Sequence, residues 1–314
     1  MKTRRLVITL LAIVLIGIFT FGYFFLVRRS PLDEIKGVSP SATYSEPKFL
    51  FAINNEPAHP LDRPMAVAVV NNRIFVSDSG RNQVLVFDYN GHFEKYLKPG
   101  AVSFRTPYGL TFDGTNLYVA DTTAGKIYIF DAGGNYKGVF DVQGVTLAGP
   151  GVILAQGGKL YVSDLQNQKI FVFDLQGRLL KTYGREGSGA GELSFPHGVA
   201  VDAQGSIYVA DSGNNRIIVY NVDGSVRETI GGGGNSDILT PRGLIRDRSG
   251  NLWVVSGMAN KIIVYHPDGS KIMEFGKEGQ DYGQFSLPNG VYIDDNDRVY
   301  ITEVGTSRVS VFNR

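Results

Sequence analysis

A segment of about 45 residues recurs six times along this chain and dominates any reading of its fold. Each copy contains a short apolar run, rich in β-branched and aromatic residues, that ends at an acidic or hydroxyl residue. The runs are residues 74–78, 117–121, 160–164, 207–211, 252–256 and 299–303. Such runs between Asp- and Gly-containing turns are typical of strands. The period and the several strands per copy predict an all-β fold, a six-bladed β-propeller with one sheet per blade.

Every copy but the last continues with a third strand, a turn that ends in glycine and an outer fourth strand. In the fourth copy these are residues 216–220, 221–224 and 226–230. The sixth copy has no such turn, because the chain stops soon after its third strand. Residues 48–53 (KFLFAI) precede the first copy and have no blade of their own. We expect them to pair beside residues 309–312 in the last blade, which would close the ring and remove two open sheet edges.

The fourth copy, residues 195–224, carries the clearest motif, FPHGVAVDAQGSIYVADSGNNRIIVYNVDG. It resembles the NHL repeat, with its pattern P-x-G-V-A-V-D, G-x-I/L-Y-V-A-D and N-x-R-I-x-V-F-D-x-x-G, and the resemblance extends over about residues 48–314. It implies an NHL-type six-bladed propeller. It does not imply one activity, because NHL propellers include RNA-binding modules, extracellular sensor domains of membrane proteins and peptide-processing lyases.

The N-terminal segment predicts a membrane anchor. Residues 6–27 contain no charged side chain, and as a helix they would span roughly 33 Å, enough for the hydrocarbon core of a bilayer. We therefore expect an anchor at residues 1–28 (transmembrane 6–27), a linker at 29–46 and the propeller at 47–314. A buried core helix and a cleaved signal peptide are the alternatives. The length of the run, its bulky aromatic end and the two arginines that follow favour an uncleaved anchor.

The anchor also suggests a location. Lys and Arg residues are nearly balanced on the two sides of the apolar run, so the positive-inside rule does not orient it. A first helix ahead of a long C-terminal domain is typical of a signal anchor. We therefore expect a single-pass membrane protein, related to the membrane-anchored members of the family, with its propeller on the periplasmic or extracellular side.

Composition excludes several classes of site and partner. The chain has 31 Lys and Arg against 30 Asp and Glu, so no net field attracts nucleic acid or an anionic membrane surface. It has no cysteine, which excludes disulfides, thiolate metal sites and thiol nucleophiles. The near-zero net charge therefore disfavours a nucleic-acid partner.

The residue x of each Pro-x-Gly motif is expected on a loop at one mouth of the central channel. The six are Met65, Tyr108, Gly151, His197, Arg242 and Asn289. They differ from copy to copy while the surrounding residues repeat, which favours a binding surface. Unconstrained loop residues are the alternative. We expect all but the glycine to bind a protein, peptide or small ligand, with the propeller acting as a binding, sensor or scaffold module.

An acidic residue ends the second strand in five copies, on the same face. The five are Asp78, Asp121, Asp164, Asp211 and Glu303. A ring of carboxylates can hold a hard cation. An acid in nearly every copy fits a repeated structural role better, in which each accepts backbone N–H bonds in its own turn.

A metal-dependent hydrolase or lyase is the alternative function, lactonase- or esterase-like, or similar to the amidating lyases of the family. The resemblance to those lyases implies a zinc held by several histidines, but of the four histidines only His197 lies at the mouth, so a three-histidine site cannot form. Asp211, Asn289 and Glu303 leave a carboxylate and amide site open. No cofactor is predicted, a divalent cation remains an option, and His197 is a candidate acid or base.

Overall fold

The computed structural model describes residues 45–54, 58–233 and 236–314. The expected anchor and most of the linker fall within residues 1–44 and so lie outside the described residues. Within the described ranges, no helix combines the length and the apolar character needed to cross a bilayer.

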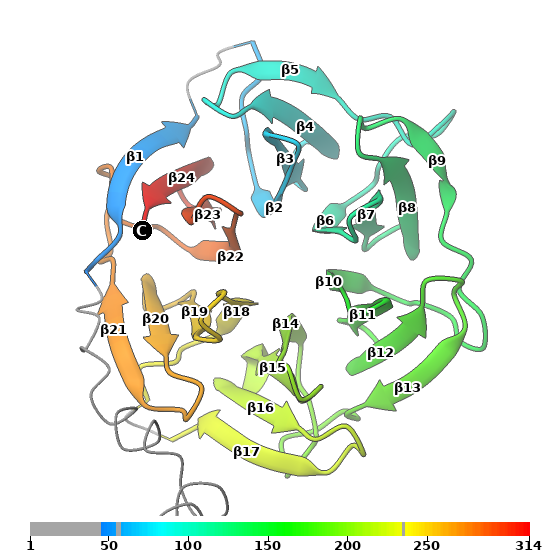
Figure 1. Ribbon diagram of the computed structural model, residues 1–314, viewed down its shortest axis with the longest axis vertical. Coiled ribbons are helices and arrows are strands. Elements are labelled where there is room, and N and C mark those ends of the chain that lie inside the picture. The colour runs from blue at the N-terminus through cyan, green and yellow to red at the C-terminus, as the bar shows by residue number, and fades with distance from the viewer. Residues whose placement is uncertain (1–44, 55–57, 234–235) are drawn as a thin grey trace, which may run out of the picture. The chain divides into compact units, whose positions relative to one another are not determined.

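The propeller consists of six four-stranded antiparallel sheets arranged as blades around a central axis (Figure 1). Blade 1 is β2 (Pro64–Val70), β3 (Arg73–Asp78), β4 (Gln83–Asp88) and β5 (Phe93–Tyr96). Blade 2 is β6 (Pro107–Phe112), β7 (Asn116–Asp121), β8 (Lys126–Asp131) and β9 (Tyr136–Val139). Blade 3 is β10 (Pro150–Gln156), β11 (Lys159–Asp164), β12 (Lys169–Asp174) and β13 (Leu179–Tyr183).

The second half of the chain repeats this order. Blade 4 is β14 (Pro196–Val201), β15 (Ile207–Asp211), β16 (Arg216–Tyr220) and β17 (Val226–Gly231). Blade 5 is β18 (Pro241–Arg246), β19 (Leu252–Ser256), β20 (Lys261–Tyr265) and β21 (Lys271–Phe275). Blade 6 is β22 (Pro288–Ile293), β23 (Arg298–Glu303), β24 (Arg308–Asn313) and β1 (Lys48–Ile53). The predicted all-β six-bladed propeller is confirmed.

Blade 6 is built from both ends of the propeller. Strand β1 pairs antiparallel with β24, from Lys48 opposite Asn313 to Ile53 opposite Val309, with a register shift between Phe49 and residue 51. The sheet therefore takes its outer strand from before the first copy and its three inner strands from the last. This pairing satisfies the backbone edge of β24 and joins the first described strand to the last.

The tight turns between third and fourth strands follow from local side-chain chemistry. Between β4 and β5, the Asp88 carboxylate accepts hydrogen bonds from the N–H groups of Asn90 and His92, both at 2.9 Å. Gly91 donates its N–H to the Asp88 carbonyl and has a φ of 90°, which glycine adopts without steric cost. The same Asp-to-Gly bond closes the turns at residues 131–134 and 174–177.

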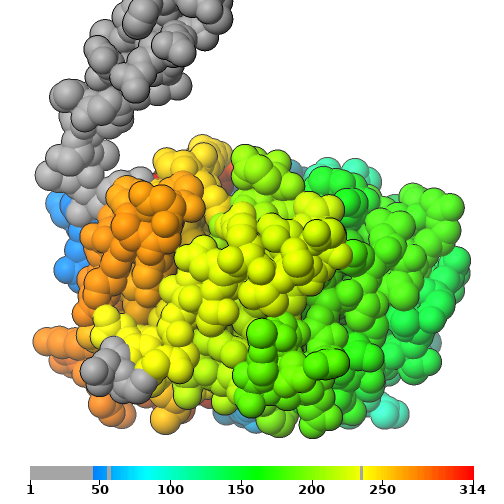
Figure 2. Space-filling view, turned by 90° about the horizontal axis from the view of Figure 1, so that it is seen from below, coloured from blue at the N-terminus to red at the C-terminus, as the bar shows by residue number. Residues whose placement is uncertain are grey.

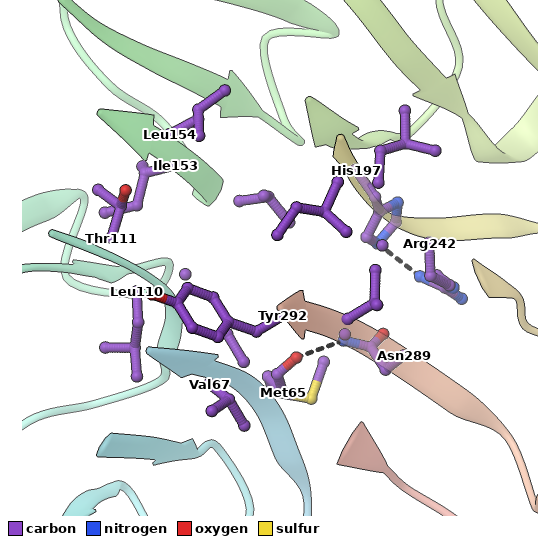
Figure 3. Close-up of a pocket in the computed structure, with 18 of the residues that line it drawn as sticks. Met65, Val67, Leu110, Thr111, Ile153, Leu154, His197, Arg242, Asn289 and Tyr292 are labelled. Atoms are coloured by element: carbon purple, nitrogen blue, oxygen red, sulfur yellow. Dashed lines mark hydrogen bonds between the residues drawn. The ribbon is translucent and has the colours of Figure 1, made fainter. Parts of the chain in front are cut away.

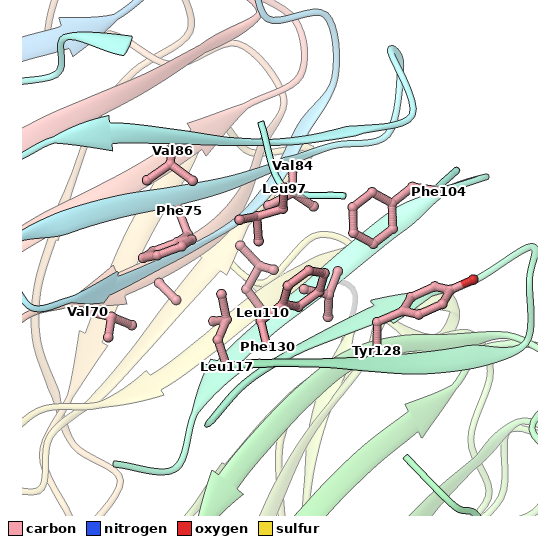
Figure 4. Close-up of a cluster of buried hydrophobic side chains, with 12 residues drawn as sticks. Val70, Phe75, Val84, Val86, Leu97, Phe104, Leu110, Leu117, Tyr128 and Phe130 are labelled. Carbon is pink, nitrogen blue, oxygen red and sulfur yellow. The ribbon is translucent and has the colours of Figure 1, made fainter. Parts of the chain in front are cut away.

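The hydrophobic core lies between the blades. Figure 4 shows the cluster between blades 1 and 2, in which Phe75 and Val86 of one sheet face Leu117 and Phe130 of the next. A comparable cluster of buried residues joins each neighbouring pair of blades, including blades 6 and 1. Each blade therefore buries both faces, and burial of apolar side chains on this scale stabilises the closed ring.

The fourth strands form the outer wall, which Figure 2 shows from the side where β21, β17 and β13 lie. In β17 every residue but Ile230 is exposed. At the other edge of each sheet, the innermost strands β2, β6, β10, β14, β18 and β22 converge around the central channel (Figure 1).

Candidate functional site

The six x residues belong to strands, not to loops as the sequence suggested. Each innermost strand begins at the proline of Pro-x-Gly, so x is its second residue. In blade 4, Pro196 pairs with Asp211 and Val199 with Val209, so His197 and Gly198 form a bulge of one extra residue. The other blades have a register shift at the same place. A bulge re-aims the side chain that it carries, here toward the end of the channel.

Five of the six x residues line one cavity at this end of the channel (Figure 3). We call this end of the channel the mouth. They are Met65, Tyr108, His197, Arg242 and Asn289. Gly151 has no side chain to contribute, and Val152 and Ile153 line its sector. Deeper in the channel the lining is mostly apolar, with Val67, Leu110 and Leu154 among it. The structure therefore brings together the five residues that the sequence suggested for ligand binding.

The cavity is small. Its volume is about 100 Å³, room for a few water molecules, whereas pockets for small-molecule ligands measure roughly 300–1,000 Å³. A ligand larger than a few atoms must therefore sit over the mouth, not inside the channel.

His197 is held in one tautomer. Its Nδ1 lies 2.8 Å from the Phe195 carbonyl oxygen, which can only accept, and 2.9 Å from Ser212 Oγ. The Ser212 hydroxyl donates its own proton to the Pro241 carbonyl. Nδ1 must therefore carry the ring proton, which leaves Nε2 as an acceptor. Arg242 Nη1 lies 2.5 Å away and donates to this nitrogen (Figure 3).

The environment of His197 keeps the ring neutral. Only 6% of the residue is exposed. Burial, followed by the positive charge of Arg242, lowers the pKa of His197 from 6.5 to about 3. Since the neutral ring already accepts from Arg242 and donates to Phe195, neither nitrogen is available to take a proton from a substrate. The acid or base role suggested by the sequence does not fit this geometry.

Arg242 brings to the mouth a positive charge that no acid among the described residues neutralises. Its contact with neutral His197 supplies no negative charge, and none of the described residues that line the cavity is acidic. The ion pairs of the described chain leave Arg242 out. Two other arginines with little exposure do pair, Arg216 with Asp211 and Arg308 with Glu303. Arg242 therefore differs from them in lacking a carboxylate.

Tyr108 and Asn289 complete the polar part of the mouth. Asn289 Nδ2 donates to the Met65 carbonyl at 2.9 Å, and the Tyr108 hydroxyl lies 3.5 Å from Asn289 Oδ1. Burial raises the pKa of the Tyr108 phenol, and the nearby Arg242 and Arg63 only partly offset this. Tyr108 thus stays a neutral hydroxyl that can donate. The described residues of the mouth consequently offer hydrogen-bond donors and a positive charge, and none of them is acidic.

The acidic residues that end the second strands accept backbone hydrogen bonds within their own blades. Asp78 accepts the N–H groups of Asp62 and Arg63 at 2.9 and 2.8 Å. Asp121 holds residues 105–106 in the same way, and Asp164 holds residues 148–149. The structural role is supported, but each carboxylate reaches the segment before the innermost strand as well as its own turn.

The structure does not assemble Asp211, Asn289 and Glu303 into a metal site. Asp211 pairs with Arg216, and Glu303 pairs with Arg308 and accepts from Ser310 Oγ at 2.6 Å. The amide of Asn289 is occupied in the mouth, as described above. Among the residues that the structure describes, no three His, Cys, Asp or Glu side chains lie close enough together to hold a metal ion.

Sequence reasoning missed Ser212, whose hydroxyl links blade 4 to blade 5 and contacts His197. A signal for it exists in the repeats. Ser79 Oγ donates to the Pro107 carbonyl at 2.5 Å, and Thr122 Oγ1 donates to the Pro150 carbonyl at 2.8 Å. A hydroxyl residue directly after the strand-ending Asp therefore binds the Pro of the next blade in three copies.

Comparisons with known proteins agree with this architecture. The model of a 6-bladed beta-propeller family matches residues 144–231, and the model of the NHL repeat matches residues 285–312. With the six blades of the structure, these matches confirm the resemblance to NHL-type six-bladed propellers. No curated protein matches the chain in sequence.

Solved structures with a similar fold have varied titles. A streptogramin B lyase structure is 18% identical, with a TM-score of 0.58 over 80% of this chain and 78% of that one. A gluconolactonase from Xanthomonas campestris is 20% identical, with a TM-score of 0.62 over 81% and 86%. A nidogen/laminin complex is 16% identical, with a TM-score of 0.55 over 68% and 79%. At such identities the likeness shows the fold alone.

Proposed function

We propose that this six-bladed propeller is a binding, sensor or scaffold module that holds a partner over the mouth of its channel. The observation that carries the proposal is the state of His197. The one histidine at the mouth is buried and neutral, and both of its nitrogens are engaged, so it positions Arg242. Polar side chains that converge on an opening without a free base or a metal-ligand cluster among the described residues suit recognition better than turnover.

The proposal includes a membrane location. The uncharged run at residues 6–27 supports a single-pass anchor, and the signal-anchor pattern supports a propeller outside the cytoplasm. Protease that reaches the outer side of the anchoring membrane, with the inner compartment still closed, should then digest the propeller. Protection of the propeller until the inner compartment is opened would contradict this orientation.

The rival function is a metal-dependent hydrolase or lyase at the same mouth. Lyase and gluconolactonase structures share the fold, which keeps this chemistry in consideration. Metal analysis of the purified chain, followed by lactonase, esterase and lyase assays with and without a chelator, separates the two functions. A stoichiometric divalent ion whose removal abolishes turnover would refute the binding proposal.

Binding is tested by capture of partners from a membrane extract. The triple variant Tyr108→Ala, His197→Ala and Arg242→Ala should lose partners that the wild-type chain retains. A matched change of exposed outer-wall residues, Glu228→Ala with Thr229→Ala, should retain them. Loss in both variants, or in neither, would argue against the mouth as the binding surface. A thermal melt of each variant distinguishes lost binding from lost folding.

A further inference from the structure

We infer that the partner presents a carboxylate next to apolar side chains, as an acidic peptide segment does, and that it docks in a hollow beside the mouth. This rests on the proposed function and specifies its ligand. The hollow lies between blades 5, 6 and 1 and has a volume of about 240 Å³. The lining residues that matter for binding are Arg63, Arg242, Met258, Leu287, Pro288 and Val304. We call it the three-blade hollow.

Electrostatics select the charge of the ligand. Arg63 and Arg242 both line the three-blade hollow, and none of the described residues that line it is acidic. In the described part of the chain neither guanidinium forms an ion pair, in contrast to the paired arginines Arg216 and Arg308. Arg63 is exposed, whereas Arg242 is partly buried, and a charge with restricted access to water is stabilised by an opposite charge. A planar carboxylate matches the donor fork of a guanidinium and accepts two hydrogen bonds from it.

The neutrality of His197 sharpens this selection. The imidazole contacts the same guanidinium that faces the three-blade hollow, and it accepts a hydrogen bond without adding a charge. An aspartate or glutamate at this position would neutralise Arg242 from within. The histidine instead fixes the direction of the guanidinium and leaves its charge for a ligand.

The walls select what accompanies the carboxylate. Met258 and Leu287 line the hollow and are 61% and 45% exposed, although both are large apolar side chains. Pro288 and Val304 extend the same apolar wall. Exposed apolar side chains that rim a concave site are typical of interaction surfaces. The three-blade hollow therefore combines two guanidinium groups with apolar side chains, which suits an acidic residue flanked by apolar ones.

Hydrogen bonds between blades hold two residues that line the three-blade hollow, Leu287 and Thr240. Leu287 has a φ of 49°, a left-handed conformation that is strained for a residue with a side chain. Its N–H donates to Asn260 Oδ1 at 2.8 Å, across from blade 5. Thr240 has the same φ, and its N–H donates to Asn215 Oδ1 of blade 4 at 2.7 Å. Side-chain amides thus hold the residue ahead of Pro-x-Gly in place in blades 5 and 6, as preorganised recognition requires.

Size and shape favour a peptide over RNA. The volume of about 240 Å³ suits an acidic side chain or chain end better than a whole nucleotide. Single-stranded nucleic acid is held by exposed aromatic rings that stack on its bases. No aromatic residue is among the described residues that line this hollow, and the nearby Tyr108 is 7% exposed.

The test uses an array of short synthetic peptides in matched pairs, probed with the purified full-length chain. One member of each pair carries Asp or Glu between apolar residues, and the other carries Asn or Gln. Each pair is made with a free and with an amidated C-terminus, which distinguishes a side-chain carboxylate from a chain end. We expect binding only where a carboxylate is present. Equal binding of neutral and acidic peptides, or no binding at all, would overturn the inference.

Variants locate the binding. Arg63→Gln and Arg242→Gln should each lower the affinity for the best-binding acidic peptide by about tenfold or more, as measured by fluorescence anisotropy. This is the cost of losing a charge-assisted hydrogen bond. Arg81→Gln, at an exposed arginine on the β3–β4 turn of the same face, should change it less than about twofold. Unchanged affinity in both hollow variants would overturn the inference.

Two further measurements keep the outcome unambiguous. Arg242→Lys retains the charge without the fork, so it should fold as the wild type does and bind with intermediate affinity. A single-stranded RNA oligonucleotide that binds and loses affinity in Arg63→Gln would overturn the inference in favour of nucleic acid. If neutral peptides bind and the mouth triple variant abolishes that binding, the proposed function stands while the carboxylate requirement fails. A metal-dependent turnover would instead defeat the proposed function.

Discussion

Replacement of His197 by glutamine offers a direct test of the chemistry at the mouth. The Gln amide oxygen can accept from Arg242 as Nε2 does, but the residue cannot titrate. In the folded wild type the pKa of His197 is lowered to about 3, first by burial and then by Arg242. In the unfolded chain the pKa returns to about 6.5. As the pH falls below 6.5, His197 becomes protonated in the unfolded chain but stays neutral in the folded chain. The free energy of unfolding therefore decreases as the pH falls toward 3.

The size of the effect follows from the shift. Each pKa unit is about 1.4 kcal/mol, so His197 should remove roughly 2–3 kcal/mol of unfolding free energy between pH 7 and about pH 4.5. Other groups titrate in the same window, and comparison of the two proteins cancels them. In urea titrations at both pH values, the wild type should lose about 2–3 kcal/mol more than His197→Gln.

A control and a refutation complete the test. Thr229→Ala, on the exposed outer wall, removes no titratable group and should lose as much stability between the two pH values as the wild type does. If wild type and His197→Gln lose stability in parallel, the ring protonates freely. The histidine could then act as a base, and the case against catalysis at the mouth would fail.

Three further predictions concern the scaffold. Arg308→Met leaves the buried Glu303 carboxylate without its partner and should cost about 3–5 kcal/mol in urea denaturation, whereas Arg178→Met removes the guanidinium of a side chain that is 70% exposed and should cost less than about 1 kcal/mol. Equal losses would contradict this. Gly198→Ala places a methyl group 2.4 Å from the Arg242 carbonyl oxygen and should lower the free energy of unfolding by about 1–3 kcal/mol. An unchanged thermal midpoint would disprove this. Deletion of residues 49–53 removes most of β1 and should prevent folding or sharply lower the melting temperature, and an unaltered melt would show that the pairing with β24 is dispensable.

The architecture was readable because it is repeated. In each blade, runs of β-branched and aromatic residues predict the strands, and Asp and Gly predict the turns. Six copies of this pattern leave little ambiguity about the fold. The orphan strand at residues 48–53 was identified by counting, since one copy lacked its outer strand. Local chemistry of this kind needs no knowledge of distant contacts, as the Asp88 turn illustrates.

The site was readable only in part. Variation among the x residues pointed to the five that share the mouth, but it could not show that they belong to strands or how they interact. His197 looked like a candidate base because its type is typical of bases. Its role as a neutral acceptor depends on the Phe195 carbonyl, the Ser212 hydroxyl and Arg242 of the next blade. Protonation is set by surroundings, and these come together only in three dimensions.

The amino-acid order alone therefore specified six blades, their turns and the positions at which the blades differ, because strand and turn preferences are local. The meaning of those positions came from the closed ring. Contacts between blades decide whether Arg242 is paired, whether Asp211 is free for a metal and whether Leu287 borders a hollow. Charge and burial at the mouth are properties of several blades at once, and no single repeat contains them.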